Sequence, residues 1–364
     1  MIVDTGSHHT AFPCKGCVDC GEEHHTDSYF NPDQSNSFTP LQCHECRHEA
    51  KCEKTDRIEL DWTRVENFDN ACVVRQSYTE GSSWTAYQVR DMLFCGGKDV
   101  FSAADPISQR YAVQFMFGCQ ITSSGLFHSQ LADGIMGLSQ HESALPRVMY
   151  DQGKIQHRVF SLCFRKEMVV SKKGVSAGVL TIGGVDRRLN SSPMVYAKNL
   201  ARTGWYTVYV KNVYLQKGGS SRNDHSNIIQ IPIDTLSVNS DKGVIIDSGT
   251  TDSYLHRSMI GPFNEIWKQL TGKSYSNAPV RLSREQLLSL PTILIQIMAF
   301  NDRLDADIGS PNDVVGLMGN LDPESPHDVL LSIPATHYME YSPSKDVYTP
   351  RFYFTEVCSI IYQF

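Results

Sequence analysis

Short runs in which apolar and polar residues alternate recur along the chain, a period that is typical of β-strands. The alternation is clearest over residues 205–210. Other segments have the length and apolar content of strands: 111–119, 133–138, 159–164, 178–182, 329–333 and 347–354. Polar stretches at 166–173, 218–224 and 301–328 are expected to be loops. We therefore predict an all-β protein with a few short helices.

Two segments have the apolar spacing of a helix instead. Over 258–270 the apolar residues fall on one side of a helix, and Gly272 is expected to end it. Over 142–152 the pattern predicts a second, shorter helix with Pro146 near its start.

Two apolar strands end in an aspartate that small residues follow. Residues 244–246 lead into Asp247-Ser248-Gly249-Thr250, and residues 2–3 lead into Asp4-Thr5-Gly6-Ser7. The β-branched residues favour a buried strand, and the small residues let the backbone turn sharply after the acid. One such motif in each half of the chain predicts two related lobes, each of which presents a carboxylate to a shared cleft.

Paired carboxylates have a definite chemistry. Two that face each other cannot both ionise easily, so they share a proton and titrate as a unit. One then removes a proton from a water molecule while the other protonates the carbonyl oxygen of a peptide bond, which gives a tetrahedral intermediate without a covalent adduct. Asp4 and Asp247, which lie 243 positions apart, are therefore a candidate site for peptide hydrolysis, with no cofactor and no metal.

The composition excludes other classes of function. The 364 residues are 41% hydrophobic and 10% aromatic, enough to fill the cores of two domains. A formal net charge of −7 leaves no basic stripe for a nucleic acid. We find no apolar run of membrane length and no charged leader before Asp4, so a targeting segment or a membrane anchor would lie outside this chain.

Eleven cysteines are many for a cytosolic protein, and seven of them lie between Cys14 and Cys72. Such a density favours disulfide bonds in the secretory pathway, either in the endoplasmic reticulum or outside the cell. A glycosylation sequon at Asn190 points to the same compartment. The odd total leaves at least one thiol without a partner in this chain.

Zinc ligation is the alternative interpretation of the early cysteines. The runs Cys14-x2-Cys17-x2-Cys20 and Cys43-x2-Cys46 have ligand-like spacing. The histidines nearest to them are His24, His25, His44 and His48. We favour disulfides over metal and expect these histidines to be solvated loop residues, while a zinc-binding module over 14–52 stays an alternative function.

The first half of the chain contains three further features. The run from Asp4 to Cys20 is expected to be loop-like, and residues 14–72 to form a cysteine-stapled insertion. The Gly and Ser residues that follow Tyr78 lie between two apolar segments and predict a hairpin tip, which is a candidate flap.

We place an N-terminal lobe at 1–188 and a C-terminal lobe at 189–364.

Four landmarks in this order resemble the pepsin-like aspartic proteases over nearly the whole chain. They are the motif that begins at Asp4, the flap tyrosine Tyr78, the apolar-apolar-Gly strand at 134–137, and the motif that begins at Asp247. The resemblance implies a bilobed all-β fold, a polypeptide substrate, a monomer, and catalysis by the shared-proton pair that is established for that family.

The resemblance also implies a role for each residue of the site. Asp4 and Asp247 would be catalytic, Ser7 and Thr250 would hydrogen-bond the outer carboxylate oxygens, and the residues after each aspartate would tie the two turns together. The supporting and substrate-binding residues implied are Thr5, Gly6, Ser7, Ser248, Gly249, Thr250, Tyr78, Glu80 and Gly81.

A narrower resemblance is to the plasmepsin V-like branch, whose members process secreted effector proteins in the endoplasmic reticulum. It is carried by Phe12-Pro13-Cys14-x2-Cys17-x2-Cys20-Gly21 after the first motif and by Tyr78-Thr79-Glu80-Gly81-Ser82 in the flap. In that branch a flap glutamate recognises an arginine three residues before the cut, and Glu80 stands at that position. An arginine paired with a carboxylate gives directional selectivity.

The sequence departs from the family pattern at both ends. Only three residues precede Asp4, where the family has several strands, and Tyr362 stands where a second apolar-apolar-Gly strand would have its glycine. We therefore expect a fold that lacks its first and last strands. The alternative to an active endopeptidase is a catalytically impaired or peptide-binding homologue.

Overall fold

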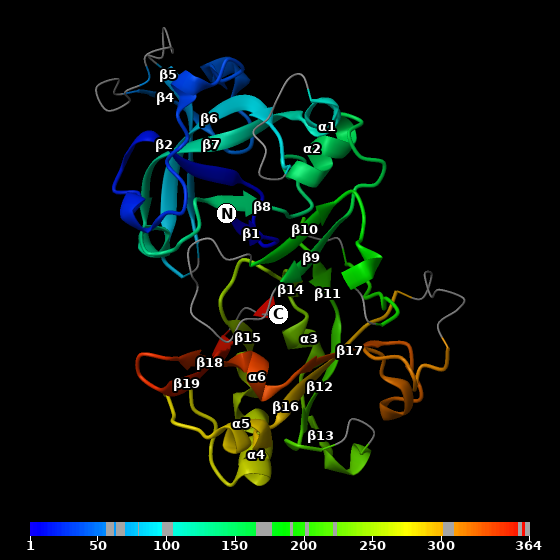
Figure 1. The fold of residues 1–364 in the computed structure, drawn as a ribbon. Coiled ribbons are helices and arrows are strands. Elements are labelled where there is room, and N and C mark those ends of the chain that lie inside the picture. The colour runs from blue at the N-terminus through cyan, green and yellow to red at the C-terminus, as the bar shows by residue number, and fades with distance from the viewer. Residues whose placement is uncertain are drawn as a thin grey trace. The chain divides into compact units, whose positions relative to one another are not determined.

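The computed structural model describes residues 1–55, 62, 70–78, 80–96, 105–164, 177–189, 192–200, 204–220, 224–300, 309–355 and 359–360 (Figure 1). With 36% strand and 21% helix, the structure confirms the predicted all-β class. The predictions for the loop 166–173, for Asn190 and for Tyr362 fall outside the described residues.

The chain divides into two compact units. Unit 1 comprises the described residues of Met1–Leu162 and Ser171–Val185, and unit 2 those of Cys163–Val170 and Asp186–Phe364. Each unit has its own sheets and its own apolar core, so each is described by itself.

Unit 1 is built on an eight-stranded sheet in the order β1-β8-β2-β7-β6-β5-β4, with β3 paired to β6 (Figure 1). Its strands are β1 (Ile2–Asp4), β2 (Thr10–Val18), β3 (Thr39–Pro40), β4 (Lys51–Lys54), β5 (Asn70–Ser77), β6 (Ser83–Leu93), β7 (Val113–Ser124) and β8 (Ile135–Gly137). A separate pair, β9 (Phe160–Phe164) with β10 (Gly178–Ile182), lies mainly in unit 1, and the last two residues of β9 belong to unit 2. The α-helices of unit 1 are α1 (Pro106–Tyr111) and α2 (Leu145–Asp151), and its 3₁₀ turns are η1 (Glu22–His24), η2 (Pro32–Gln34), η3 (Cys43–Glu45) and η4 (Gly125–His128).

The run between Asp4 and Cys20 contains a strand, so the prediction of a loop there is wrong. Strand β2 pairs in parallel with β7 and buries most of its first half. The cysteines, Pro13 and Gly16 interrupt the apolar alternation on which a strand prediction depends. Burial against β7 and the disulfide Cys14–Cys119 hold the strand in place despite its weak local signal.

Four disulfides confirm that the early cysteines are bridged and do not form a zinc module. They are Cys14–Cys119, Cys17–Cys20, Cys43–Cys52 and Cys46–Cys72. The last two staple the insertion around η3 to β4 and β5. In the chain-entropy view, a bridge across 105 positions, as in the first pair, stabilises the fold by about 4–5 kcal/mol.

The cores of unit 1 lie on the two faces of this sheet. Phe115 and Leu138 belong to the larger cluster, beside Leu145 of α2, whereas Trp84 anchors a smaller one with Phe127. The helix α2 begins at Leu145 with Pro146 in its first turn, as predicted. The strands that carry the first motif and the hairpin are thereby fixed on one packed scaffold.

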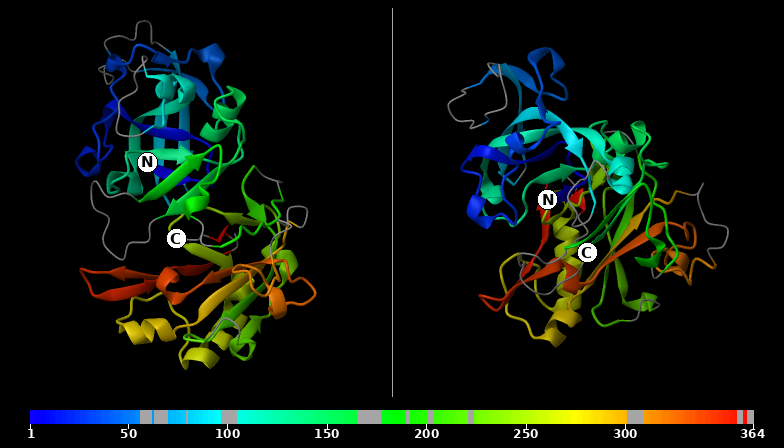
Figure 2. Two further views of the ribbon diagram at one scale, coloured as in Figure 1. Left: turned by 45° about the vertical axis from the view of Figure 1, so that its right-hand side comes forward. Right: turned by 45° about the horizontal axis from the view of Figure 1, so that its top comes forward.

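Unit 2 contains a five-stranded sheet in the order β11-β14-β21-β15-β20, a four-stranded sheet in the order β13-β12-β16-β17, and the hairpin β18–β19. The strands are β11 (Thr207–Val208), β12 (Val210–Gln216), β13 (Ile228–Ile231), β14 (Val244–Ile246), β15 (Ser253–His256), β16 (Thr292–Ile297), β17 (Val329–Ile333), β18 (Met339–Ser342), β19 (Val347–Pro350), β20 (Phe352–Thr355) and β21 (Ser359–Ile360). The hairpin, red-orange in Figure 2, extends to one side of the unit.

The helices of unit 2 are short, with one exception. They are α3 (Thr235–Val238), α4 (Ile260–Thr271), α5 (Arg284–Ser289) and α6 (Ala335–Tyr338), with 3₁₀ turns η5 (Arg187–Leu189), η6 (His225–Asn227), η7 (Arg257–Met259) and η9 (Gly319–Leu321). The longest, α4, buries Phe263, Ile266 and Trp267 in the core and ends at Gly272, whose φ of 75° is the left-handed cap that glycine adopts without strain. Both features were expected from the sequence.

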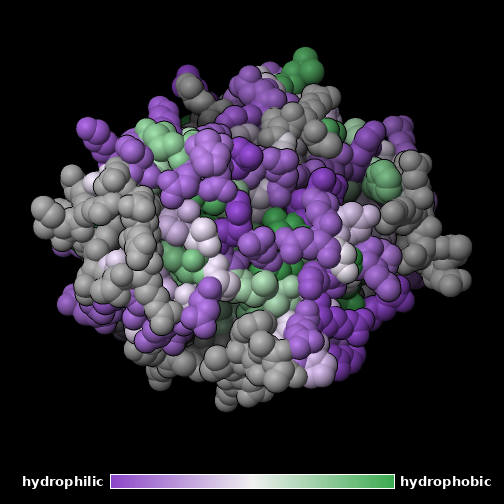
Figure 3. Space-filling model, turned by 90° about the horizontal axis from the view of Figure 1, so that it is seen from above, coloured by the Kyte–Doolittle hydropathy of each residue, from purple (hydrophilic) through white to green (hydrophobic). Residues whose placement is uncertain are grey.

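One face of the molecule can be compared by hydropathy. On the face seen in Figure 3, purple hydrophilic side chains predominate among the described residues, and hydrophobic ones lie in small groups between them. No helix among the described residues has the length and apolar character needed to cross a membrane.

Candidate active site

The first motif follows strand β1, which runs parallel to β8 with Asp4 opposite Gly137. Asp4 is buried, with an exposed fraction of 4%. Its Oδ1 accepts a hydrogen bond from the backbone N–H of Gly6 at 2.8 Å, and its Oδ2 accepts one from the hydroxyl of Ser7 at 2.5 Å. These two bonds fix the direction in which the carboxylate points.

Glycine is required where β8 passes the motif. A Cβ on Gly137 would lie 2.5 Å from the carbonyl carbon of His8 and 2.7 Å from the nitrogen of His9. At Gly134, where φ is 137°, a Cβ would lie 2.4 Å from the carbonyl oxygen of Ala11. The predicted apolar-apolar-Gly strand thus lies directly against the turn that holds Asp4.

The second motif has the same plan inside unit 2. Strand β14 runs parallel to β21, with Ile246 opposite Ile360. Asp247 is half-buried, and its Oδ1 accepts a hydrogen bond from the N–H of Gly249 at 2.8 Å. Its Oδ2 accepts one from the hydroxyl of Thr250 at 2.5 Å. These two hydrogen bonds of Asp247 therefore repeat the two described for Asp4, atom for atom.

Residues 359–360 form strand β21, the parallel neighbour of the second motif, as residues 135–137 do for the first. The expectation that the C-terminal lobe lacks its last strands stays a prediction. Tyr362 lies outside the described residues. Because Asp4 belongs to unit 1 and Asp247 to unit 2, their pairing, and the bridging role of Thr5 and Ser248, stay predictions.

A hairpin carries the predicted flap residues, and its existence is confirmed. Strands β5 and β6 are antiparallel, and the N–H of Tyr78 donates to the carbonyl of Ser82 at 2.8 Å. Gly81 donates to the carbonyl of Tyr78 at 3.0 Å and has a φ of 97°, which other residues rarely adopt. Glu80 is exposed at this tip.

Tyr78 is held over the first motif by Trp84, a residue that the sequence analysis missed. The indole N–H of Trp84, which is 2% exposed, donates to the Tyr78 hydroxyl at 3.1 Å. Burial raises the pKa of Tyr78, and the charge of Asp4 raises it further, while hydrogen bonds with Trp84 and Ser7 act in the opposite direction. The phenol therefore stays protonated beside the Asp4 turn. The sequence signal was a tryptophan six positions after the tyrosine in the same hairpin.

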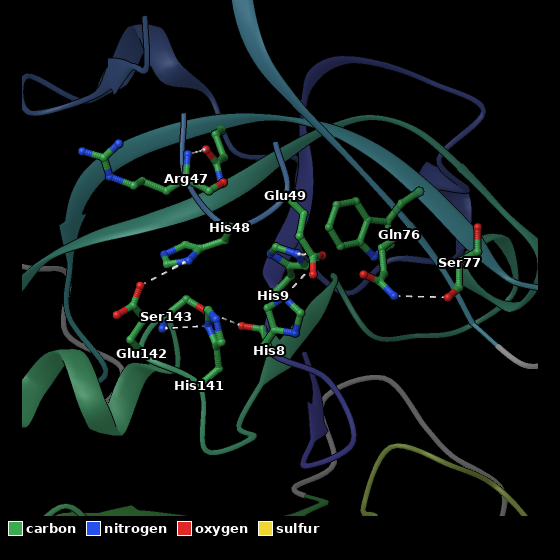
Figure 4. A network of polar contacts seen from close by, with 12 residues as sticks. His8, His9, Arg47, His48, Glu49, Gln76, Ser77, His141, Glu142 and Ser143 are labelled. Atoms are coloured by element: carbon green, nitrogen blue, oxygen red, sulfur yellow. Dashed lines mark hydrogen bonds and ion pairs between the residues drawn. The ribbon is translucent and has the colours of Figure 1, made fainter. Parts of the chain in front are cut away.

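Four histidine rings, two of them in the segment that directly follows the first motif, lie close together (Figure 4). The ring centroids lie 4.1 Å apart for His8 and His9, 4.5 Å for His8 and His141, and 4.8 Å for His48 and His141. Glu49 points into the same group. This cluster could not be seen in the sequence, because it joins the segment after Ser7 to the insertion and to the loop after β8.

The pKa of His9 is lowered to about 3, mainly by burial and also by the neighbouring His8, His48 and His141. Burial is also the main cause of the lowered pKa values of His8 and His48, although Glu49 partly opposes it at both. These three rings are therefore neutral imidazoles near pH 7.

The expectation of solvated loop histidines is wrong for two residues. His25 is 5% exposed, and its Nε2 lies 2.8 Å from the carbonyl oxygen of Cys20, while the side chain of His48 is 11% exposed. The ring of His25 packs against Tyr29 near Asp133, and the ring of His48 packs against His141. His24 and His44 are exposed, as expected.

Comparison with known families gives two matches. The sequence model of eukaryotic aspartyl proteases matches residues 106–307. The model of the xylanase inhibitor N-terminal domain matches residues 1–184. Each match covers more than half of the chain.

Curated relatives agree with the predicted plasmepsin V-like resemblance. Aspartic protease 5 of Toxoplasma gondii is 30% identical over 201 residues, which are 53% of this chain and 19% of that protein. Plasmepsin V of Plasmodium falciparum (isolate 3D7) is 27% identical over 192 residues, which are 51% of this chain and 27% of that protein. The matched segment thus spans only about a fifth to a quarter of each relative.

Proposed function

This chain belongs to the eukaryotic aspartyl proteases, and from that membership we propose that it is an endopeptidase whose catalytic pair is Asp4 and Asp247. One observation carries the proposal. Both carboxylates accept a backbone N–H on Oδ1 at 2.8 Å and a hydroxyl on Oδ2 at 2.5 Å. Two acids that sit at strand ends with the same bonds are suited to act as matched halves of one site.

In the proposed reaction the pair carries one shared proton. The ionised carboxylate takes a proton from a water molecule, which attacks the peptide carbonyl, and the protonated carboxyl donates to the carbonyl oxygen. The bonds from Gly6, Ser7, Gly249 and Thr250 keep each carboxylate oriented through this exchange, so little reorganisation is needed. Tyr78 would cover the substrate from the hairpin.

A matched pair of variants tests this reaction. Asp247→Asn should lower the rate of peptide cleavage at least about a hundredfold, because the amide cannot serve as a base. Asp241→Asn is the control, since Asp241 is exposed, has a φ of 50° that asparagine tolerates, and takes no part in the motif. Equal cleavage by both variants would show that the activity comes from elsewhere, and a lack of cleavage by the unaltered chain would favour the impaired homologue.

We further propose that the substrates are proteins of the secretory pathway with a basic residue upstream of the cut. The four disulfides are typical of an oxidising compartment. Glu80 is exposed at the hairpin tip, where an arginine of the substrate can pair with its carboxylate. The named relatives support this placement by similarity alone.

The role of Glu80 is tested by comparing two peptides that differ only in arginine or alanine three residues before the cut. Glu80→Ala should reduce the preference for arginine about tenfold or more, because a charge-assisted pair is worth about 1.5 kcal/mol or more. An unchanged preference in the variant would remove Glu80 from the recognition of the substrate.

A further inference from the structure

Three ligand atoms converge behind the first motif. The Nε2 atoms of His8 and His9 lie 3.7 and 3.6 Å from the same carboxylate oxygen, Oε2 of Glu49. One ligand atom from each of the three residues lies within 4.8 Å of the other two (Figure 4). Two imidazoles and a carboxylate are ligands that zinc and related transition ions prefer.

His9 adds an independent observation. Its side chain is 8% exposed, and its Nε2 is buried without a hydrogen-bond partner among the described residues. A buried nitrogen without a hydrogen bond raises the free energy of the folded state, because it has lost its hydrogen bond to water. A cation between this atom and Glu49 would bind its lone pair.

The spacing suits a small tetrahedral ion. With bonds of about 2.0–2.1 Å to nitrogen and oxygen, two ligand atoms on tetrahedral zinc lie about 3.3 Å apart. The two distances to Glu49 exceed this by a few tenths of an ångström. The Glu49 side chain is 72% exposed, so it can move inward, and an ion can enter from its side.

The backbone of the insertion is shaped to present Glu49. His48 and Glu49 have φ values of 49° and 70°, a left-handed conformation that is uncommon for residues other than glycine. The bridges Cys43–Cys52 and Cys46–Cys72 close around this turn. Strained residues that the surrounding structure holds in place are concentrated at functional sites.

A purely ionic explanation of the cluster is weak. One exposed carboxylate faces both His8 and His9, whose rings are 4.1 Å apart, so a second imidazolium would lie against the first.

We propose that His8, His9 and Glu49 form a binding site for one divalent transition-metal ion of the zinc class, with a fourth position open to water. Bound there, the ion would join the insertion to the segment that begins immediately after Ser7, the residue whose hydroxyl holds Asp4. The same site touches the flap scaffold, because the His9 ring lies edge-on to Trp84 at 6.0 Å. The ion would then stabilise unit 1 whether or not the chain cleaves peptides.

Direct binding tests the site without any assay of activity. The folded, disulfide-bonded chain is stripped with a chelator and titrated with zinc in a calorimeter. We expect one ion per chain and a rise in Tm of about 5 °C at a hundredfold excess over Kd. Calcium and magnesium should give neither effect, because they favour sites made of oxygen ligands.

Two glutamate variants distinguish specific coordination of zinc by Glu49 from nonspecific attraction of cations to acidic side chains. Glu49→Gln should weaken zinc binding at least about tenfold. Glu142→Gln is the matched control, because Glu142 is 70% exposed and lies 3.6 Å from His48 in the same cluster but outside the three-residue set. His8→Asn should act like Glu49→Gln. The proposal is overturned if zinc does not bind, if both glutamate variants weaken it equally, or if neither Glu49→Gln nor His8→Asn weakens it.

Discussion

At the scale of single residues, the candidate site depends on hydroxyl and N–H donors that fix each acid. Ser7 and Thr250 hold the Oδ2 atoms of Asp4 and Asp247 at 2.5 Å. The indole N–H of Trp84 donates to the hydroxyl of Tyr78 at 3.1 Å, and this bond fixes the tyrosine on the same unit as Asp4. A small loss of orientation at any of these positions should reduce the rate more than the stability.

Trp84→Phe isolates that bond, because phenylalanine keeps most of the apolar packing and lacks the N–H. We expect kcat/KM for peptide cleavage to fall about five- to tenfold, the equivalent of one neutral hydrogen bond. Trp205→Phe is the control, since the half-buried Trp205 stacks on Lys242 in unit 2, outside the proposed site. Indistinguishable kinetics for the two variants would mean that Trp84 does not position Tyr78.

At the scale of elements, each motif strand is braced by a parallel neighbour, β8 for β1 and β21 for β14. The close passage of β8 depends on glycine, because the backbone of residues 8–9 occupies the place of a side chain. The geometry of the first acid therefore depends on a strand that lies more than a hundred positions away in the sequence.

Gly137→Ala should lower the free energy of unfolding by about 3 kcal/mol or more, since its Cβ would lie 2.5 Å from backbone atoms that cannot move aside cheaply. Gly261→Ala, in the first turn of α4, is the matched control. It meets nothing within 4 Å and should raise stability by about 0.5 kcal/mol. Chemical denaturation measures both, and an equally stable Gly137→Ala would show that β8 is not packed as described.

At the scale of the whole molecule, the two units share one plan: an apolar strand, an acid, a glycine turn and a hydroxyl. Unit 1 adds the β5–β6 hairpin and an insertion that four disulfides tie to the sheet or close within it. Unit 2 adds the helix α4, whose buried residues form part of the apolar core of that unit. Family membership and local geometry together make the two-acid account the simplest explanation of the repeated plan.

Local sequence patterns predicted much of this fold. The strands Gly178–Ile182 and Val329–Ile333, and the glycine cap of α4, agree with the structure because each has a clear local sequence pattern. Strand β2 was missed because long-range pairing and a disulfide, not alternation, hold it. The approach of Glu49 to His8 and His9 was missed for the same reason, since it joins residues some 40 positions apart.

Asp4 and Asp247 are proposed to act as one catalytic unit, and a double-mutant cycle on peptide cleavage is the most direct test of that proposal. Asp4→Asn and Asp247→Asn should each lower kcat at least about a hundredfold, and the double variant should be no slower than the slower single variant, because residues that act as a unit are not additive. Losses that multiply in the double variant, or a single variant that keeps its activity, would contradict the account.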